Sequence, residues 1–155
     1  MYDLRFNPSL FDAGNLPDDP DLAKNGFYAA FAIVENSENI LLYIGKAEKE
    51  TFSERIPAHT TDDHRAWLKR ALIPDARIVY RIAPVADKTI IDDLESILIY
   101  YHAPYGNTQK VRKYFGPRPV PTITSNLSRL SVPHDHPIFE IVHARNFTYH
   151  RHDLP

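Results

Sequence analysis

The chain has 155 residues, of which 43% are hydrophobic and 25% are charged, and its formal net charge at pH 7 is -2. This length suits one domain with a proper core and is short for two. The absence of cysteine excludes disulfides, thiolate metal sites and cysteine nucleophiles, and the small negative charge argues against general binding to polyanions.

The N-terminal segment MYDLRFNPSLFDAGNLP has no basic start followed by an apolar stretch, so we expect no secretory signal. No run of residues approaches the roughly 18 apolar positions that a membrane-spanning helix needs. We therefore expect a cytoplasmic protein without a membrane partner.

Charge is distributed unevenly along the chain. Residues 1–25 carry a net charge of -3, whereas residues 107–155 carry +4 and five of the eight histidines. Such asymmetry is a weak indication of a nucleic-acid partner. A solvated tail explains it equally well, so both interpretations stay open.

Apolar and aromatic runs predict the strands. GFYAAFAIVE (26–35) and ILLYIG (40–45) are joined by a short polar loop, which is typical of an antiparallel hairpin. ARIVYRIAP (76–84) alternates apolar and charged residues and predicts a half-buried strand. A last strand is expected in IFEIVHA (138–144), after a proline-punctuated, irregular stretch over 114–137.

Capping signals predict three helices. Thr51 and Glu54 form a capping box for a short helix that Pro57 ends. A second helix is expected over residues 62–72, with Thr61 as its N-cap. Its apolar stripe is formed by Trp67, Leu68, Ala71 and Leu72.

The third predicted helix follows Asp87, its expected N-cap, and stops before Pro104. This element order predicts an α+β fold with a small, mostly antiparallel three-stranded sheet flanked by helices. We expect an irregular arm over residues 1–24, one domain over 25–112, and a C-terminal extension over 113–155. That extension is basic and histidine-rich, and we expect it to pack on the domain.

Four short elements carry residue types that suit phosphodiester cleavage. This reaction needs a base for the attacking water and stabilisation of charge on the phosphate and on the leaving oxygen. A carboxylate suits Mg²⁺, arginine binds phosphate through its planar fork, and tyrosine or histidine can pass on a proton. The elements are Gly26-Phe27-Tyr28, Tyr43-Ile44-Gly45-Lys46, Arg55 with His59, and Glu95 with Pro104 and Asn107.

At these residues the sequence resembles the GIY-YIG nuclease superfamily. Gly26-Phe27-Tyr28 stands for the first motif, with Phe in place of the usual aliphatic residue, and Tyr43-Ile44-Gly45 is the second motif unchanged. LYIGKA and ESILIYYHAPYGN look most like the N-terminal incision domain of the bacterial excision-repair nuclease. The resemblance covers roughly residues 25–108. Fourteen residues separate Tyr28 from Tyr43, a longer hairpin than is usual in the family.

The resemblance implies a role for each motif residue. Tyr28 would accept a proton from the attacking water or position that water, and Tyr43 would orient the water or contact the phosphate. Arg55 would bind the phosphate and stabilise the transition state. Glu95 would hold a single divalent cation, Mg²⁺ or Mn²⁺, and Asn107 would brace the site beside the substrate.

Local chemistry adds two residues to this set and indicates a candidate for a second metal ligand. Lys46 directly follows the glycine of the second motif and could reach a phosphate as a point charge. His59 lies one turn beyond Arg55 and could shuttle a proton. Asp92, three residues before Glu95, is the one nearby candidate for a second metal ligand.

Basic residues after the motifs suit contact with a nucleic-acid backbone. We expect Lys110, Arg112 and Lys113 to bind the substrate, because KVRKYFGPRP interleaves basic and aromatic residues. A solvated linker is the alternative. The HxH pairs at 134–136 and 150–152 could also bind zinc, although they flank turns and termini.

The sequence thus predicts a divalent-metal-dependent endonuclease that hydrolyses DNA phosphodiester bonds in repair, restriction or the movement of a mobile element. RNA stays open as a substrate. A homodimer is one way for a single site to cut both strands of a duplex. The alternative is a catalytically inactive module of the same fold that binds nucleic acid or protein.

Overall fold

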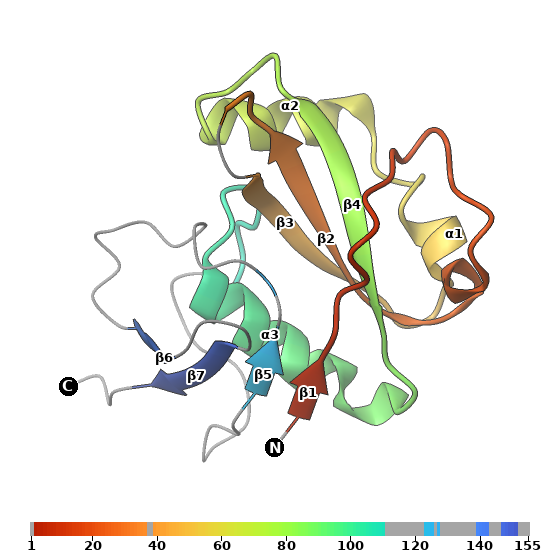
Figure 1. The fold of residues 1–155 in the computed structure, drawn as a ribbon, viewed down its shortest axis with the longest axis vertical. Helices are drawn as coiled ribbons and strands as arrows, with labels where there is room; N and C mark the ends of the chain where they lie inside the picture. Colours follow the sequence, from red (N-terminus) through yellow and green to blue (C-terminus); the bar gives the residue numbers. More distant parts are fainter. Residues whose placement is uncertain are drawn as a thin grey trace.

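The computed structural model describes residues 2–36, 39–110, 123–125, 127, 139–142 and 147–151. They form an α+β fold with two sheets (Figure 1). The elements in chain order are β1 (Tyr2–Leu4), η1 (Pro20–Ala23), β2 (Gly26–Ile33), β3 (Ile40–Ala47), α1 (Phe52–Arg55), α2 (Thr61–Arg70), β4 (Arg77–Pro84), η2 (Lys88–Ile90), α3 (Ile91–His102), β5 (Ile123–Ser125), β6 (Phe139–Val142) and β7 (Phe147–Arg151).

The central sheet has the strand order β3-β2-β4, and both pairings are antiparallel. Alternating residues of β2 enter two separate cores. Phe27, Ala29 and Phe31 pack with α3, whereas Tyr28, Ala30 and Ala32 pack with α1 and α2. The expected three-stranded antiparallel sheet flanked by helices is confirmed.

A β-bulge interrupts the pairing of β2 with β3. Ala30 pairs with Tyr43 and Phe31 pairs with Leu41, so Leu42 is an extra residue on β3. A bulge bends its strand and changes the direction of neighbouring side chains. It therefore sets the direction of Tyr43, which lies directly beside it.

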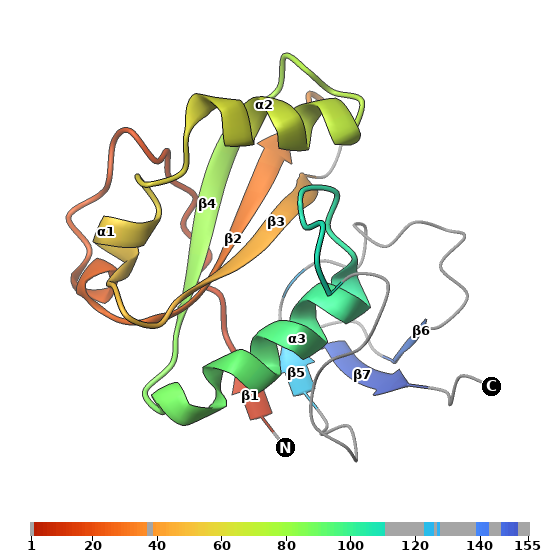
Figure 2. The same ribbon diagram turned by 180° about the vertical axis from the view of Figure 1, so that it is seen from behind.

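The second sheet has the order β1-β5-β7-β6, with β1 parallel to β5 and the other pairs antiparallel. Figure 2 shows α3 running past β1, β5 and β7, and Leu4 and Leu127 join the core around α3. This sheet was not predicted. The irregular stretch expected over 114–137 contains β5, and β7 follows the predicted last strand, which is β6.

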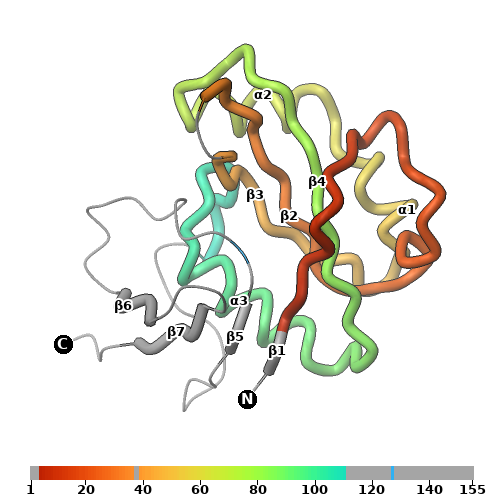
Figure 3. The backbone as a smooth tube through the Cα atoms, in the orientation of Figure 1, coloured from red at the N-terminus to blue at the C-terminus, as the bar shows by residue number. Residues whose placement is uncertain are grey.

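The N-terminal arm is also better ordered than the sequence suggested. It runs along the outer edge of β4 (Figure 3), where the Asn7 amide donates to the Ile82 carbonyl at 2.7 Å and Phe11 forms a bridge with Tyr80. Because these contacts pair the free edge of β4, the arm is part of the fold around the central sheet.

The helix boundaries differ from those expected in three places. The N-cap of α2 is Thr60 and not Thr61, because Asp63 is placed to complete a capping box with Thr60. Leu72 lies beyond the end of the helix and is 86% exposed, so it is no part of the buried stripe. Asp87, the expected N-cap of the third helix, caps the short 3₁₀ helix η2 instead, and α3 follows η2 directly with Ile90 at its N-cap position. Within the part of the chain that is described, no helix could span a membrane.

Candidate active site

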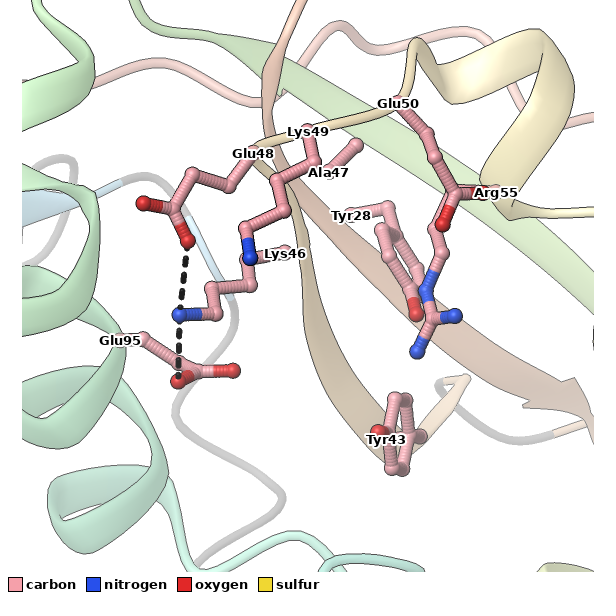
Figure 4. Close-up of a pocket in the computed structure, with 9 residues that line it drawn as sticks. All are labelled: Tyr28, Tyr43, Lys46, Ala47, Glu48, Lys49, Glu50, Arg55 and Glu95. Atoms are coloured by element: carbon pink, nitrogen blue, oxygen red, sulfur yellow. Dashed lines mark ion pairs between the residues drawn. The ribbon is translucent and has the colours of Figure 1, made fainter.

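Six of the predicted site residues gather around an open hollow of about 310 Å³. Tyr28 comes from β2, Tyr43 and Lys46 from β3, Arg55 from α1 and Glu95 from α3 (Figure 4). His59 lies against the Tyr28 hydroxyl. Residues from four separate elements thus meet at one place.

Tyr28 is fully buried, and its hydroxyl lies 2.6 Å from Nε2 of His59. Burial raises the pKa of the Tyr28 phenol, an effect that the nearby Arg55 guanidinium partly offsets. The phenol therefore carries its proton at neutral pH. It can take a proton from water only if its own proton moves to a neighbouring base.

Gly45 makes room for this tyrosine. It lies opposite Tyr28 in the pairing of β2 with β3. A Cβ at this position would overlap the Tyr28 ring and hydroxyl. The glycine of the second motif therefore lets the Tyr28 side chain lie across β3.

His59 lies behind the hollow as the hydrogen-bond partner of the Tyr28 hydroxyl. Its side chain is 9% exposed, and its Nδ1 lies 3.6 Å from a carboxylate oxygen of Asp63. Burial and the Arg55 charge lower the pKa of the imidazole, against the opposing effect of Asp63. His59 is accordingly neutral near pH 7 and able to accept a proton on one nitrogen.

Tyr43 is fixed by aromatic packing. Its ring stacks on Trp67 with the ring centres 4.4 Å apart and an angle of 10° between planes. The His59 ring is packed against both rings in a T-shaped arrangement. Its centre lies 5.3 Å from the ring centre of Tyr43 and 4.9 Å from that of Trp67. Burial, with a smaller effect of Glu95, raises the pKa of the Tyr43 phenol. Tyr43 is therefore a rigid, protonated hydrogen-bond donor at the mouth of the hollow.

Arg55 is in the last turn of α1 and supplies positive charge on this wall. Its guanidinium lies beside the Tyr28 hydroxyl (Figure 4). Tyr28 has the largest effect on its pKa, which is raised. The fork is well placed to bind an anion in the hollow.

The opposite wall is an ion-pair cluster around Glu95. Its Oε2 lies 2.5 Å from Nζ of Lys110 and 4.0 Å from Nζ of Lys46. Lys46 also pairs with Glu48 at 3.1 Å and with Asp92. Lys46 thus meets carboxylates in the structure, although the sequence analysis assigned it to phosphate.

Glu95 and Asp92 are the carboxylates of this wall that could hold a hydrated cation, and both contact Lys46. In the described residues, no group of three or more His, Cys, Asp or Glu side chains is placed to hold a metal. Mg²⁺ commonly keeps several waters and binds through one or two carboxylates. Glu95 with Asp92 meets that requirement once the lysines are displaced.

Asn107 braces the edge of β3. Its side-chain oxygen accepts from the Ile44 amide at 2.9 Å, and its Nδ2 donates to the Ile44 carbonyl at 2.9 Å. The neighbouring Gly106 amide donates to the carbonyl of Leu42, the bulge residue, at 2.6 Å. This turn pairs an otherwise free strand edge and fixes the segment that carries Tyr43.

A second hollow of about 330 Å³ adjoins the first and shares Tyr43 and Glu95 with it. Its other wall is the segment from Gly106 to Lys110 and Ile99 of α3. Lys110 therefore contacts Glu95 of the ion-pair cluster and also lines the second hollow. The other predicted substrate-binding residues, Arg112 and Lys113, lie outside the described residues, as do the HxH pair at 134–136 and His152 of the second pair, whereas His150 lies in β7.

Sequence reasoning missed three residues of the site. Trp67 was read only as core, Gly45 only as part of a motif, and Asp63 was not considered. The available signal was the capping box of α2, because it places Asp63 at the start of the helix, close to the residue that precedes the N-cap Thr60.

Comparisons with family models, with curated proteins and with solved structures found no match to this chain. The resemblance to GIY-YIG nucleases thus depends on the motif residues themselves.

Proposed function

We propose that this protein is a GIY-YIG-type endonuclease that hydrolyses phosphodiester bonds in DNA. The observation that carries the proposal is the contact of 2.6 Å between the Tyr28 hydroxyl and Nε2 of His59, in a hollow that Arg55 and Glu95 also line. A proton acceptor, a fixed cation and a carboxylate therefore face the same space. The hydrolysis of a phosphate diester by water requires these groups.

Tyr28 and His59 would activate the water together. As the water oxygen attacks phosphorus, its proton moves to the Tyr28 oxygen and the Tyr28 proton moves to Nε2 of His59. The bond from phosphorus to the leaving sugar oxygen breaks, this oxygen takes a proton from solvent, and His59 returns its proton to solvent. The lowered pKa of His59 keeps its imidazole neutral and free to accept at neutral pH. The raised pKa of Tyr28 makes its oxygen a stronger base toward water once its own proton has moved.

Arg55 would hold the phosphate and stabilise the negative charge that builds up on its oxygens. Tyr43, which is fixed by Trp67, would donate to the phosphate or to the water. Glu95 would hold the cation, Mg²⁺ or Mn²⁺, with Asp92 as the second carboxylate within reach. When bound, that cation would supply further stabilisation of the developing charge.

The proposed activity also suggests where the protein acts, whether it works as a dimer, and which biological role it has. A chain without cysteine that acts on DNA suits the cytoplasm. One site cuts one strand, so a double-strand break would take a homodimer or two successive nicks. Repair, restriction and mobile-element roles all fit this chemistry.

The test is a cleavage assay on labelled single-stranded, duplex and branched DNA and on RNA, with Mg²⁺, Mn²⁺ or EDTA. Metal-dependent cutting of DNA by the wild type should be lost in Tyr28→Phe and in Glu95→Gln. Tyr80→Phe is a matched control, because Tyr80 contacts His64 at 2.7 Å in the same way but does not line the hollow. Asp93→Asn is the corresponding control on α3. Cleavage of RNA alone would move the proposal to that substrate.

A catalytically inactive binding module is the second candidate, and the ion pair of Glu95 with Lys110 favours it. A carboxylate that is already neutralised has less need of a metal. This candidate predicts that no substrate is cut by the folded wild type and that Glu95→Gln binds DNA as the wild type does.

A further inference from the structure

Three side chains lie in line behind the candidate site. Nε2 of His59 faces the Tyr28 hydroxyl at 2.6 Å, and Nδ1 on the other side of the ring faces Oδ2 of Asp63 at 3.6 Å. Both nitrogens of the imidazole therefore have a partner. The hydroxyl beside Nε2 can donate or accept a hydrogen bond, whereas the carboxylate beside Nδ1 can only accept one.

A neutral imidazole has one N–H donor and one acceptor nitrogen. If Nε2 is to receive the Tyr28 proton, then Nε2 must be the acceptor and Nδ1 must carry the hydrogen. A carboxylate on the Nδ1 side stabilises that tautomer. With the hydrogen on Nε2, a lone pair on Nδ1 would face the negative charge of Asp63.

The local fold fixes Asp63 for this task. It is in the first turn of α2, where Oδ2 accepts from the Thr60 amide at 2.8 Å. The Thr60 hydroxyl in turn accepts from the Asp63 amide at 3.1 Å. The capping box therefore holds the carboxylate in place beside His59, although the Asp63 side chain is 47% exposed.

We propose that Asp63 is a positioning residue: it holds His59 in the Nδ1–H tautomer, so that Nε2 can receive the proton of Tyr28 during hydrolysis. The inference rests on the proposed function for its role in the reaction. Asp63 itself contacts neither of the hollows, so it acts through His59. Its effect on the tautomer can be measured without any substrate.

The groups that face His59 set the direction of the expected effect. They are Tyr28 from β2, Tyr43 from β3, Arg55 from α1, and Asp63 and His64 from α2. Burial, Arg55 and His64 lower the pKa of His59, and Asp63 opposes them. Removing the charge of Asp63 should therefore lower the pKa of His59 further.

Asp63→Asn is the informative variant, because asparagine keeps an oxygen that can accept from the Thr60 amide. Asp62→Asn is the matched control. Asp62 is in the same turn of α2, its side chain is 91% exposed, and it pairs with Arg65 at 3.7 Å. Both variants remove one acidic charge from the start of the helix, but only one of them removes it from His59.

The first readout is ¹⁵N NMR of the imidazole nitrogens in the full chain, with His59 assigned by a His59→Gln variant. Wild type and Asp62→Asn should carry the hydrogen on Nδ1. Asp63→Asn should shift toward the Nε2–H tautomer and titrate at lower pH. Burial lowers the pKa of His64 and Asp63 opposes this effect, so the signal of His64 has to be assigned separately with a His64→Gln variant. A wild-type His59 with its hydrogen on Nε2 would overturn the inference.

The second readout is the pH profile of cleavage. In Asp63→Asn, kcat should fall about tenfold with KM little changed, because proton transfer and not binding is impaired. The acid limb should move to lower pH, since His59 must be neutral to act. Asp63→Glu should recover part of the rate. A lower rate with an unchanged tautomer and profile would show a merely structural role and overturn the inference.

The two hypotheses can fail separately. If His59 shows the expected tautomer and its change in Asp63→Asn, but the wild type cuts no substrate, then the hydrolase is wrong and the positioning of His59 by Asp63 stands. If the wild type cuts DNA and His59 is unaffected by Asp63→Asn, then the positioning role is wrong and the hydrolase stands.

Discussion

Lys110 Nζ contacts Oε2 of Glu95 at 2.5 Å, and Lys46 approaches the same oxygen to 4.0 Å. The Glu95 side chain is only 12% exposed, so these lysines take the place of much of its water. A cation that binds Glu95 through this oxygen has to displace Lys110. Binding of a phosphate would draw Lys110 away, because an anion competes with Glu95 for the ammonium group.

Lys110→Met should therefore bind a divalent cation more tightly than the wild type in the absence of nucleic acid. We expect the Kd for Mn²⁺ to fall about threefold to tenfold, which corresponds to about 0.7–1.4 kcal/mol for a partly exposed ion pair. Isothermal titration calorimetry with Mn²⁺ alone measures this. Lys88→Met, which removes an exposed lysine at η2, controls for the loss of general positive charge. An unchanged Kd in Lys110→Met would contradict the competition.

Gly45→Ala should damage both stability and catalysis. The added Cβ would overlap the Tyr28 ring, and a shift of the phenol by even about 1 Å can cost on the order of a hundredfold in rate. The forced displacement should also lower the free energy of unfolding by about 1–3 kcal/mol.

Urea unfolding and the cleavage assay measure the two effects of Gly45→Ala separately. Gly14→Ala is the matched control, because a Cβ at Gly14 would meet no atom within 4 Å. Wild-type stability in Gly45→Ala would mean that Tyr28 moves aside without cost.

The motif residues could be assigned to strands and helices from the sequence because the local pattern of one segment is enough for each of them. Tyr28 and Tyr43 belong to long apolar runs that predict strands, and Glu95 interrupts the apolar pattern of a helix. The bulge at Leu42 depends on how two strands pair, which no single segment reveals. The bracing of Ile44 by Asn107, across 63 positions of the chain, is hidden for the same reason.

The second sheet shows where local patterns fail. β1 and β5 have three residues each, too few for an alternating pattern to be recognised. Their parallel pairing joins residues more than a hundred positions apart. The prediction of Thr61 as the N-cap of α2 was wrong for a different reason. Thr60 and Thr61 are both suitable N-cap residues, and the capping box of Thr60 with Asp63 decides between them.

Leu72→Gly should stabilise the protein. Leu72 has φ of 60° and occupies the position after α2 where the Ile73 amide donates to the Leu68 carbonyl and the Leu72 amide donates to the Lys69 carbonyl. This pattern favours glycine, because a side chain in the left-handed region costs about 1–2 kcal/mol. Since the leucine is 86% exposed, little packing is lost.

We expect Leu72→Gly to raise the free energy of unfolding by about 1 kcal/mol, after the larger chain entropy of glycine in the unfolded state is subtracted. The urea midpoint should rise with an unchanged m-value. Leu72→Ala removes the same exposed side chain but keeps the strained backbone, so it should be close to neutral. Equal stabilisation by both substitutions would show that exposure of leucine, and not its backbone, is the cause.

His102 should make the fold sensitive to acid. It is fully buried at the end of α3, and burial lowers its pKa to about 3. The unfolded chain binds a proton at this residue below about pH 6.5, whereas the folded chain resists it down to much lower pH. Because the unfolded state then holds more protons, stability falls as pH falls through that window.

His102→Leu removes this contribution. The slope of unfolding free energy against pH, measured by urea unfolding between the two pKa values, should decrease by up to about 1.4 kcal/mol per pH unit. Other histidines and carboxylates titrate in the same range, so the difference in slope between wild type and variant is the decisive quantity. His64→Gln is the comparison, because His64 is only partly buried and should reduce the slope less. Equal slopes for the wild type and His102→Leu would mean that the folded protein accommodates a charged His102.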